Sequence, residues 1–121
     1  MADPLQDLPD LPPLLDQAIL DPLLNAEQLI ECCDASRERN IRAICGTLAR
    51  LPALRHRLGG GDGPRLIAAI DFPFGTLPAG LRLAEAQWAA ANGADELDVV
   101  PDFSALALSL IHISEPTRRI T

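Results

Sequence analysis

Short apolar runs alternate along this chain with longer segments of helical periodicity. The apolar runs begin near residues 14, 41, 66 and 96 and read LLDQAIL, IRAIC, LIAAIDF and ELDVV. Runs of this length and composition predict strands, and the intervening segments carry apolar residues at three- and four-residue spacing, which predicts helices. Strands that recur roughly every 25 to 30 residues with a helix between them indicate βα units and a parallel sheet.

Residues that begin and end helices stand at the places this pattern requires. Asn25 with Gln28 three residues later forms a capping box for a helix over residues 26–39. Pro52 suits the first turn of the second helix, and Gly93 stands where a left-handed residue ends the third. The sequence therefore fixes helix boundaries independently of the apolar pattern.

An α/β fold with a parallel sheet has two common forms, a doubly wound sheet and a (βα)8 barrel, and both fit four βα units. No Gly-x-Gly-x-x-Gly follows any predicted strand, which excludes the dinucleotide-binding version of the doubly wound sheet. The glycine-rich stretch 59–63 follows a helix rather than a strand, so we interpret it as a turn. With 121 residues, the chain holds at most one domain.

Charge and cysteine content narrow the functional classes. The chain has 17 acidic and 10 basic residues, all ten of them arginine, and a net charge of −7. This balance favours a soluble protein and argues against binding to nucleic acid, and no apolar run is long enough to span a bilayer. Three cysteines behind an acidic, proline-rich N-terminus predict reduced thiols and a cytoplasmic location.

Polar residues recur within or at the ends of the predicted strands: Asp16, Cys45, Asp71 and Asp98. A charge inside an apolar strand is costly unless it is paired or hydrogen-bonded, so the presence of Asp98 in this strand needs an explanation. One reason is catalysis, because the carboxyl ends of the strands carry the chemistry in a (βα)8 barrel. The alternative is structural, since a strand aspartate can also cap a loop or pair with an arginine.

Other chemically capable residues have structural interpretations. Cys45 can be a small buried hydrophobe, and Cys32 and Cys33 are expected to pack within a helix. No histidine is spaced to make a metal site with them. We expect Trp88 in the core and His56 on a solvated helix face. Asp71 is expected to end a strand or contact a loop.

Four segments resemble the deoxyribose-phosphate aldolase family in family order and spacing. They are LLDQAILDPLLNAEQL, AIC, IDFPFG and LAEAQWAAANGADELDVV, and together they cover about residues 13–107. The family fold is a (βα)8 barrel, so the resemblance implies that residues 13–107 are its N-terminal half, about the first four βα units. Residues 1–12 are then a flexible lead-in.

The resemblance also implies a reaction and roles for particular residues. The family reversibly cleaves 2-deoxy-D-ribose 5-phosphate, a phosphosugar of deoxynucleotide catabolism, to acetaldehyde and D-glyceraldehyde 3-phosphate. A lysine Schiff base is formed, and neither metal nor cofactor is needed. By resemblance Asp98 is the proton donor and acceptor, Asp16 sets charge and orientation near the lysines, and Cys45 lines the substrate pocket. An intact enzyme could be a homo-oligomer.

This chain contains no lysine, and the family's lysines belong to later strands, so we expect the polypeptide as given to be inactive. Residues 108–121 depart from the family pattern and, in LSLIHISEPTR, look like a translated sequencing adaptor. A half-barrel with two open edges is expected to self-associate or aggregate. Two rival interpretations are another phosphosugar (βα)8 lyase and a non-catalytic half-barrel interaction module.

Overall fold

The computed structural model describes residues 10–108 of the chain. Within them, four strands form one parallel sheet whose spatial order is the order of the sequence. The strands are β1 (Asp16–Ile19), β2 (Ala43–Gly46), β3 (Arg65–Ile70) and β4 (Glu96–Val99). Each parallel step requires a crossover connection, and the crossovers supply the helices.

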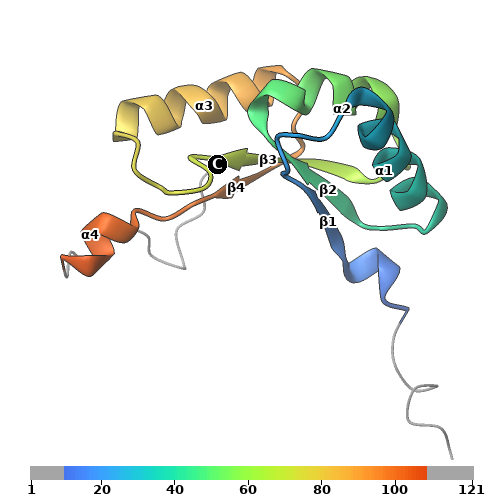
Figure 1. Ribbon diagram of the computed structural model, residues 1–121, viewed down its shortest axis with the longest axis horizontal. Helices are drawn as coiled ribbons and strands as arrows, with labels where there is room; N and C mark the ends of the chain where they lie inside the picture. Colours follow the sequence, from blue (N-terminus) through green and yellow to red (C-terminus); the bar gives the residue numbers. More distant parts are fainter. Residues whose placement is uncertain (1–9, 109–121) are drawn as a thin grey trace, which may run out of the picture.

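The first three helices lie on the same side of the sheet, as Figure 1 shows. They are α1 (Ala26–Glu38), α2 (Leu51–Leu58) and α3 (Ala79–Ala91), and the short α4 (Phe103–Ala107) follows β4. A doubly wound sheet carries helices on both faces, whereas a barrel carries them only outside. Sequential strand order and one-sided helices therefore identify the fold as part of a (βα)8 barrel, as the family resemblance implied.

The main core lies between the sheet and these helices. Alternate strand residues point toward the helices and meet the buried faces of α1, α2 and α3. The buried members of this cluster are Ile19, Cys33, Ile44, Leu51, Leu54, Leu58, Leu66, Ala68, Ile70 and Ala89. Gly46 belongs to the same face, since a Cβ added to it would overlap the Leu54 side chain.

The opposite set of strand residues forms a second, smaller cluster. It consists of the buried residues Ala43, Cys45, Ile67 and Ala69, with Leu20 packed against them. Among residues 10–108 no helix contributes to this cluster. In a barrel this face is the interior, so we call it the lumen face, defined by residues 16, 18 and 20 of the first βα unit, 43 and 45 of β2, 65, 67 and 69 of β3, and 96 and 98 of β4.

The predicted helix boundaries are confirmed. The Gln28 amide donates to Asn25 Oδ1 at 2.8 Å and the Asn25 amide donates to Gln28 Oε1 at 2.9 Å, which completes the capping box. Pro52 lies in the first turn of α2. Gly93 has φ of 98° just beyond α3, and its Cβ would overlap the Arg55 side chain, so both conformation and space favour glycine there.

Two details of the sequence prediction were wrong. Trp88 was expected in the core but is 42% exposed, because α3 meets the sheet along its small residues, with Ala89 fully buried. The first strand begins at Asp16 rather than near residue 14, since Pro12–Leu14 forms a 3-10 turn.

The lead-in and tail assignments lie largely outside the described residues. Most of 1–12 and all but one residue of 108–121 fall there, so both assignments stay predictions. Of the helices between residues 10 and 108, none has the length and apolar character needed to cross a membrane.

Leu54 offers a direct test of the helix–sheet core. It is 1% exposed and contacts the sheet from the middle helix. Leu54→Ala removes buried apolar volume and should lower the free energy of unfolding by about 2 to 5 kcal/mol. Equilibrium urea unfolding measures the change. The matched control is Leu23→Ala, since Leu23 is 87% exposed and its truncation should change stability by less than about 0.5 kcal/mol. Equal losses for the two variants would contradict the core described.

Candidate functional site

The three residues singled out for function, Asp16, Cys45 and Asp98, all lie on the lumen face. Asp16 aligns with Ala43, two residues before Cys45 on β2, and Asp98 aligns with Ala69 on β3. Residues two apart on a strand point to the same face, so the register alone places them together. The sheet brings three separate segments of sequence to one surface that carries no helix among the described residues.

Cys45 is the buried member of this group. It is 6% exposed within the lumen cluster, and burial raises the pKa of its thiol to about 11, with the negative charges of Asp98 and Asp16 adding to the effect. At neutral pH the group is a protonated thiol and a weak nucleophile. Cys45 therefore lies on the lumen face as a small, nearly apolar side chain. The charges of both carboxylates contribute to its raised pKa.

Asp98 is the strand carboxylate that has no ion-pair partner among residues 10–108. It stands third in β4 and its residue is exposed on the lumen face. Among residues 10–108 no hydrogen bond or ion pair involves its side chain. The other acidic residues of the strands, Asp16 and Glu96, are both held by an arginine. Among residues 10–108, Asp98 is thus the one strand carboxylate that is exposed without a bound arginine.

Asp16 was expected near the carboxyl ends of the strands but lies at the amino end of the sheet. It is the first residue of β1, at the amino end, rather than at the carboxyl rim where barrel chemistry gathers. The guanidinium of Arg42 binds it with two parallel hydrogen bonds, Nε to Oδ1 at 2.8 Å and Nη2 to Oδ2 at 2.9 Å. This bidentate geometry fixes the Asp16 side chain at the amino end.

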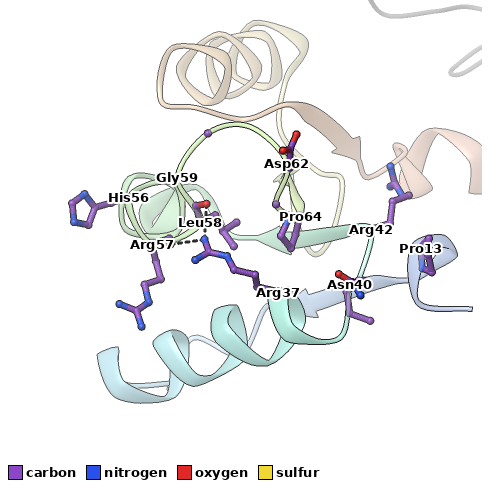
Figure 2. Close-up of a pocket in the computed structure, with 13 residues that line it drawn as sticks. Pro13, Arg37, Asn40, Arg42, His56, Arg57, Leu58, Gly59, Asp62 and Pro64 are labelled. Carbon is purple, nitrogen blue, oxygen red and sulfur yellow. Dashed lines mark hydrogen bonds between the residues drawn. The ribbon is translucent and has the colours of Figure 1, made fainter.

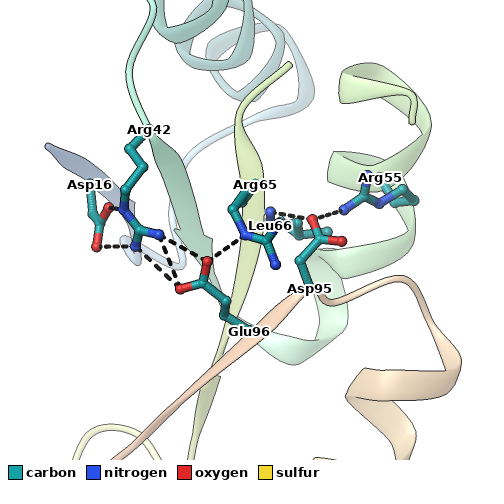
Figure 3. Close-up of polar contacts among 7 residues, drawn as sticks. All are labelled: Asp16, Arg42, Arg55, Arg65, Leu66, Asp95 and Glu96. Atoms are coloured by element: carbon teal, nitrogen blue, oxygen red, sulfur yellow. Dashed lines mark hydrogen bonds and ion pairs between the residues drawn. The ribbon is translucent and has the colours of Figure 1, made fainter. Parts of the chain in front are cut away.

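Arg42 also binds Glu96, so one side chain joins the first and last strands (Figure 3). Its Nη1 donates to Glu96 Oε2 at 2.9 Å, and Arg65 Nε donates to the same oxygen at 2.6 Å. The arginines lower the pKa of Glu96, chiefly through the hydrogen bond from Arg42, and the two carboxylates raise the pKa of Arg42. We call Asp16, Arg42, Arg65 and Glu96 the amino-end network.

Asp95 forms a neighbouring link between β4 and α2. Its Oδ2 accepts from Arg55 Nη2 at 2.6 Å and from the Leu66 amide at 2.9 Å. Partial burial opposes ionisation of this carboxyl group, but these hydrogen bonds outweigh it and the pKa of Asp95 is lowered. Each of the three carboxylates described at the amino end of the sheet is therefore paired with at least one arginine.

Asp71 organises the loop at the opposite, carboxyl end. It is 5% exposed, has φ of 55°, and accepts from the Leu77 amide. Its Oδ2 lies 3.2 Å from Arg82 Nε, and Arg82 Nη2 donates to the Val100 carbonyl at 2.6 Å. Gly75 packs against Pro101 so closely that a Cβ would overlap its carbonyl oxygen. This loop fixes the backbone just beyond Asp98. Of the two predicted alternatives for Asp71, the contact with a loop is confirmed, since β3 ends one residue earlier at Ile70.

A hollow of about 790 Å³ opens at the other end of the sheet, between α1, α2 and the glycine-rich turn (Figure 2). Its cationic side chains already have partners: Arg37 donates to the carbonyls of Arg57 and Leu58, and Arg57 pairs with Asp34. His56 is exposed at its rim, as predicted. The hollow includes neither Asp98 nor Cys45 and is not the candidate site.

Residues 10–108 contain no cluster of three or more His, Cys, Asp or Glu side chains close enough to hold a metal ion. All three cysteines are free thiols, and Cys33 is buried in the helix–sheet core. Sequence reasoning missed the amino-end network and the contact of Asp71 with Arg82. The signal available for the first was an arginine at the start of each of two strands, Arg42 immediately before β2 and Arg65 as the first residue of β3.

Known proteins were matched by sequence and by fold. A deoxyribose-phosphate aldolase of Trichormus variabilis is 32% identical over 97 residues, which are 80% of this chain and 42% of that protein. The enzyme of the same name from Thermococcus kodakarensis is 33% identical over 93 residues, 76% of this chain and 42% of its own. No family model matches the chain. The chain thus spans about two-fifths of the curated relatives it matches.

Solved structures agree with the sequence matches. An aldolase described as QR15 superposes with a TM-score of 0.78 at 26% identity, over 85% of this chain and 45% of that one. The deoxyribose phosphate aldolase of Aeropyrum pernix, described as tetrameric, gives 0.67 at 30% identity, over 78% and 40% of the two chains. These findings confirm both the resemblance to deoxyribose-phosphate aldolases and the partial barrel fold.

The amino-end network predicts a particular pH dependence. A carboxylate whose pKa is lowered on folding stabilises the fold above its unfolded pKa, and this contribution is lost as pH falls through the folded value. Glu96 is such a group, so the urea midpoint should fall as pH drops from about 5 to about 2. Arg42→Gln should lower the midpoint at pH 7 and flatten this fall, whereas Arg39→Gln, at an exposed position outside the network, should do neither. An equally steep fall in Arg42→Gln would contradict the network.

The placement of Cys45 beside Asp98 predicts an effect on thiol reactivity. Asp98→Asn removes a negative charge that raises the Cys45 pKa, so the pH midpoint for alkylation of Cys45 should move below about 11. Iodoacetamide labelling followed by peptide mass spectrometry measures the midpoint for this cysteine separately from Cys32 and Cys33. Asp62→Asn, an exposed substitution in the glycine-rich turn, is the control. An identical midpoint in Asp98→Asn and wild type would show that the two side chains do not share a face.

Proposed function

We propose that residues 13–107 form the first four βα units of a deoxyribose-phosphate aldolase. The intact enzyme would reversibly cleave 2-deoxy-D-ribose 5-phosphate to acetaldehyde and D-glyceraldehyde 3-phosphate. The observation that carries the proposal is the accessible carboxylate of Asp98 on the lumen face, in a chain similar to enzymes of that name. A barrel lumen is where this fold class assembles its catalytic groups.

Asp98 is the proposed proton donor and acceptor. Cleavage of the carbon–carbon bond next to a hydroxyl group requires that the hydroxyl lose its proton and that a proton later reach the carbon left behind. An accessible carboxylate without a fixed cation can accept the first proton and return it. Glu96, two residues earlier on the same face, is unsuited to this role because Arg42 and Arg65 hold it as an anion.

Cys45 and Asp16 are the proposed supporting residues. Cys45, protonated at neutral pH, would line the pocket without competing as a nucleophile. Asp16, held by the bidentate contact of Arg42, would act through its negative charge rather than as a movable acid. The Arg82–Asp71 contact would hold the end of β4 and thereby the position of Asp98.

The rest of the reaction would depend on groups that this sequence does not contain. In the intact enzyme a lysine amine would supply the Schiff base, and this chain has no lysine. Arginine stays protonated and cannot replace it. We therefore expect the 121-residue polypeptide alone to show no aldolase activity. Free thiols at all three cysteines support a cytoplasmic location, and the intact enzyme could assemble as a homo-oligomer.

A chimera tests the proposed function. Residues 1–107 would be joined to the part of the Trichormus variabilis aldolase that this chain does not match, and cleavage of 2-deoxy-D-ribose 5-phosphate would be followed by the aldehyde released. The chimera should be active. Asp98→Asn should lower its kcat by about 10²- to 10⁴-fold, the usual contribution of a general acid–base group, with little change in KM.

The control variant is Asp62→Asn, which alters a carboxylate far from the lumen face and should leave kcat unchanged. Circular dichroism and the melting temperature establish that each variant is folded. A folded chimera without turnover would contradict the proposed activity, and wild-type kcat in Asp98→Asn would refute the assigned role.

A further inference from the structure

The guanidinium of Arg50 binds the loop that joins β1 to α1, residues 20–25. Its Nη1 donates to the Asp21 carbonyl at 2.8 Å, and its Nη2 donates to the carbonyls of Pro22 and Leu24 at 2.9 and 2.7 Å. Hydrogen bonds from a charged donor are stronger than those between neutral groups. One side chain therefore holds three backbone positions of this loop.

The backbone that carries Arg50 is itself fixed by the helix–sheet core. Arg50 ends the 3-10 turn Leu48–Arg50, and its amide donates to the Thr47 carbonyl at 3.1 Å. The next residue, Leu51, is fully buried, and Leu48 packs against the same cluster. The contact therefore joins the β1–α1 loop to a rigid part of the structure.

The loop has few contacts of its own that would keep it in place. The Leu23 amide donates to Asp21 Oδ1 at 2.9 Å, and the Leu24 amide donates to the Asp21 carbonyl at 3.4 Å. Leu23 is 87% exposed and adds little burial. Segments with few buried apolar contacts open locally at a small cost in free energy. The three bonds from Arg50 raise that cost.

This loop lies at the carboxyl end of the lumen face, next to Cys45. β1 ends at Ile19, which aligns with Gly46, the residue after Cys45. Leu20, the first residue of the loop, packs against the cluster that contains Cys45. In a (βα)8 barrel the loops at this end of the strands build the active site. The loop that Arg50 holds is therefore one of those that would surround a substrate.

We propose that Arg50 is a positioning residue for substrate binding, which holds the β1–α1 loop in the conformation that forms one wall of the pocket. This inference rests on the proposed function. A loop released from Arg50 would adopt the binding-competent conformation only part of the time, which weakens binding in proportion. Once substrate is bound, the surroundings of Asp98 are unchanged, so the chemical step keeps its rate.

Hydrogen exchange of the full 121-residue chain tests the contact without requiring activity. In Arg50→Gln the amides of Leu23 and Leu24 should exchange at least several-fold faster than in the wild type, because the loop opens more often. The control is Arg57→Gln, which removes the same charge and the ion pair of Arg57 with Asp34 but no contact of the loop. Equal exchange at these two amides in Arg50→Gln and the wild type would overturn the proposal.

The chimera of residues 1–107 with the Trichormus variabilis enzyme measures the effect on substrate. Arg50→Gln should raise the KM for 2-deoxy-D-ribose 5-phosphate about tenfold, the change expected when the competent loop conformation falls to about a tenth of the population. The kcat should stay nearly the same, and Arg57→Gln should change neither constant. An unchanged KM in Arg50→Gln, or a loss confined to kcat, would overturn the role in binding.

The two measurements separate this inference from the proposed function. A folded chimera that lacks turnover with Arg50 in place would contradict the proposed function, whereas exchange still decides whether Arg50 holds the loop. Should Arg50→Gln fail to fold, Arg50→Lys supplies the comparison. A lysine ammonium keeps the charge but cannot span three carbonyls as the guanidinium fork does, so this variant should also exchange faster and raise KM.

Discussion

The structure depends on the requirement that a parallel sheet be covered on both faces. Parallel strands are joined by crossovers that place helices on the sheet, and their exposed backbone and apolar side chains need a layer on each side. In this chain α1, α2 and α3 cover one face only, and the other face carries a small cluster around Cys45 with no helix among the described residues. A sheet built this way is completed by further strands that curve around and enclose the second face. The candidate site lies on that face for the same reason.

The position of a carboxylate in the sheet determines whether it is paired with an arginine or left without a cation. At the amino end, Arg42 and Arg65 neutralise Asp16 and Glu96 and tie the first strand to the last. At the carboxyl end, Arg82 holds Asp71 and the backbone that follows β4. Asp98 lies between these two fixed levels and has no cation of its own in the described part of the chain. Fixed surroundings with one free acid support the proposed role of Asp98 in proton transfer, because the geometry would be set before the reaction begins.

Most of the fold could be predicted from the sequence because local signals agreed with one another. Strand spacing gave the parallel sheet, and Asn25, Pro52 and Gly93 gave helix boundaries through capping and backbone geometry that require no tertiary information. The choice between a doubly wound sheet and a barrel did not follow from periodicity, since it depends on which face each crossover covers. Trp88 was misplaced because helix periodicity does not reveal that α3 approaches the sheet through Ala89.

The candidate site was predictable only in part. A charge among strand-formers marked Asp98, and alternation along the strands determined its face. The pairing of Asp16 with Arg42 could not be predicted, because the two lie 26 residues apart and meet only through the register of β1 and β2. The same holds for Arg82, which reaches the end of β4 from the preceding helix.

The central proposal is that Asp98 faces the interior of an aldolase barrel of which this chain forms the N-terminal part. A crystal structure of residues 1–107 joined to the complementary part of the Trichormus variabilis enzyme tests it most directly. The account predicts a closed eight-stranded barrel in which the Asp98 carboxylate points into the lumen, within hydrogen-bonding reach, about 3 Å, of a lysine amine or one bridging water. An Asp98 side chain turned toward the helices, or a barrel in which no lysine approaches it, would contradict the account.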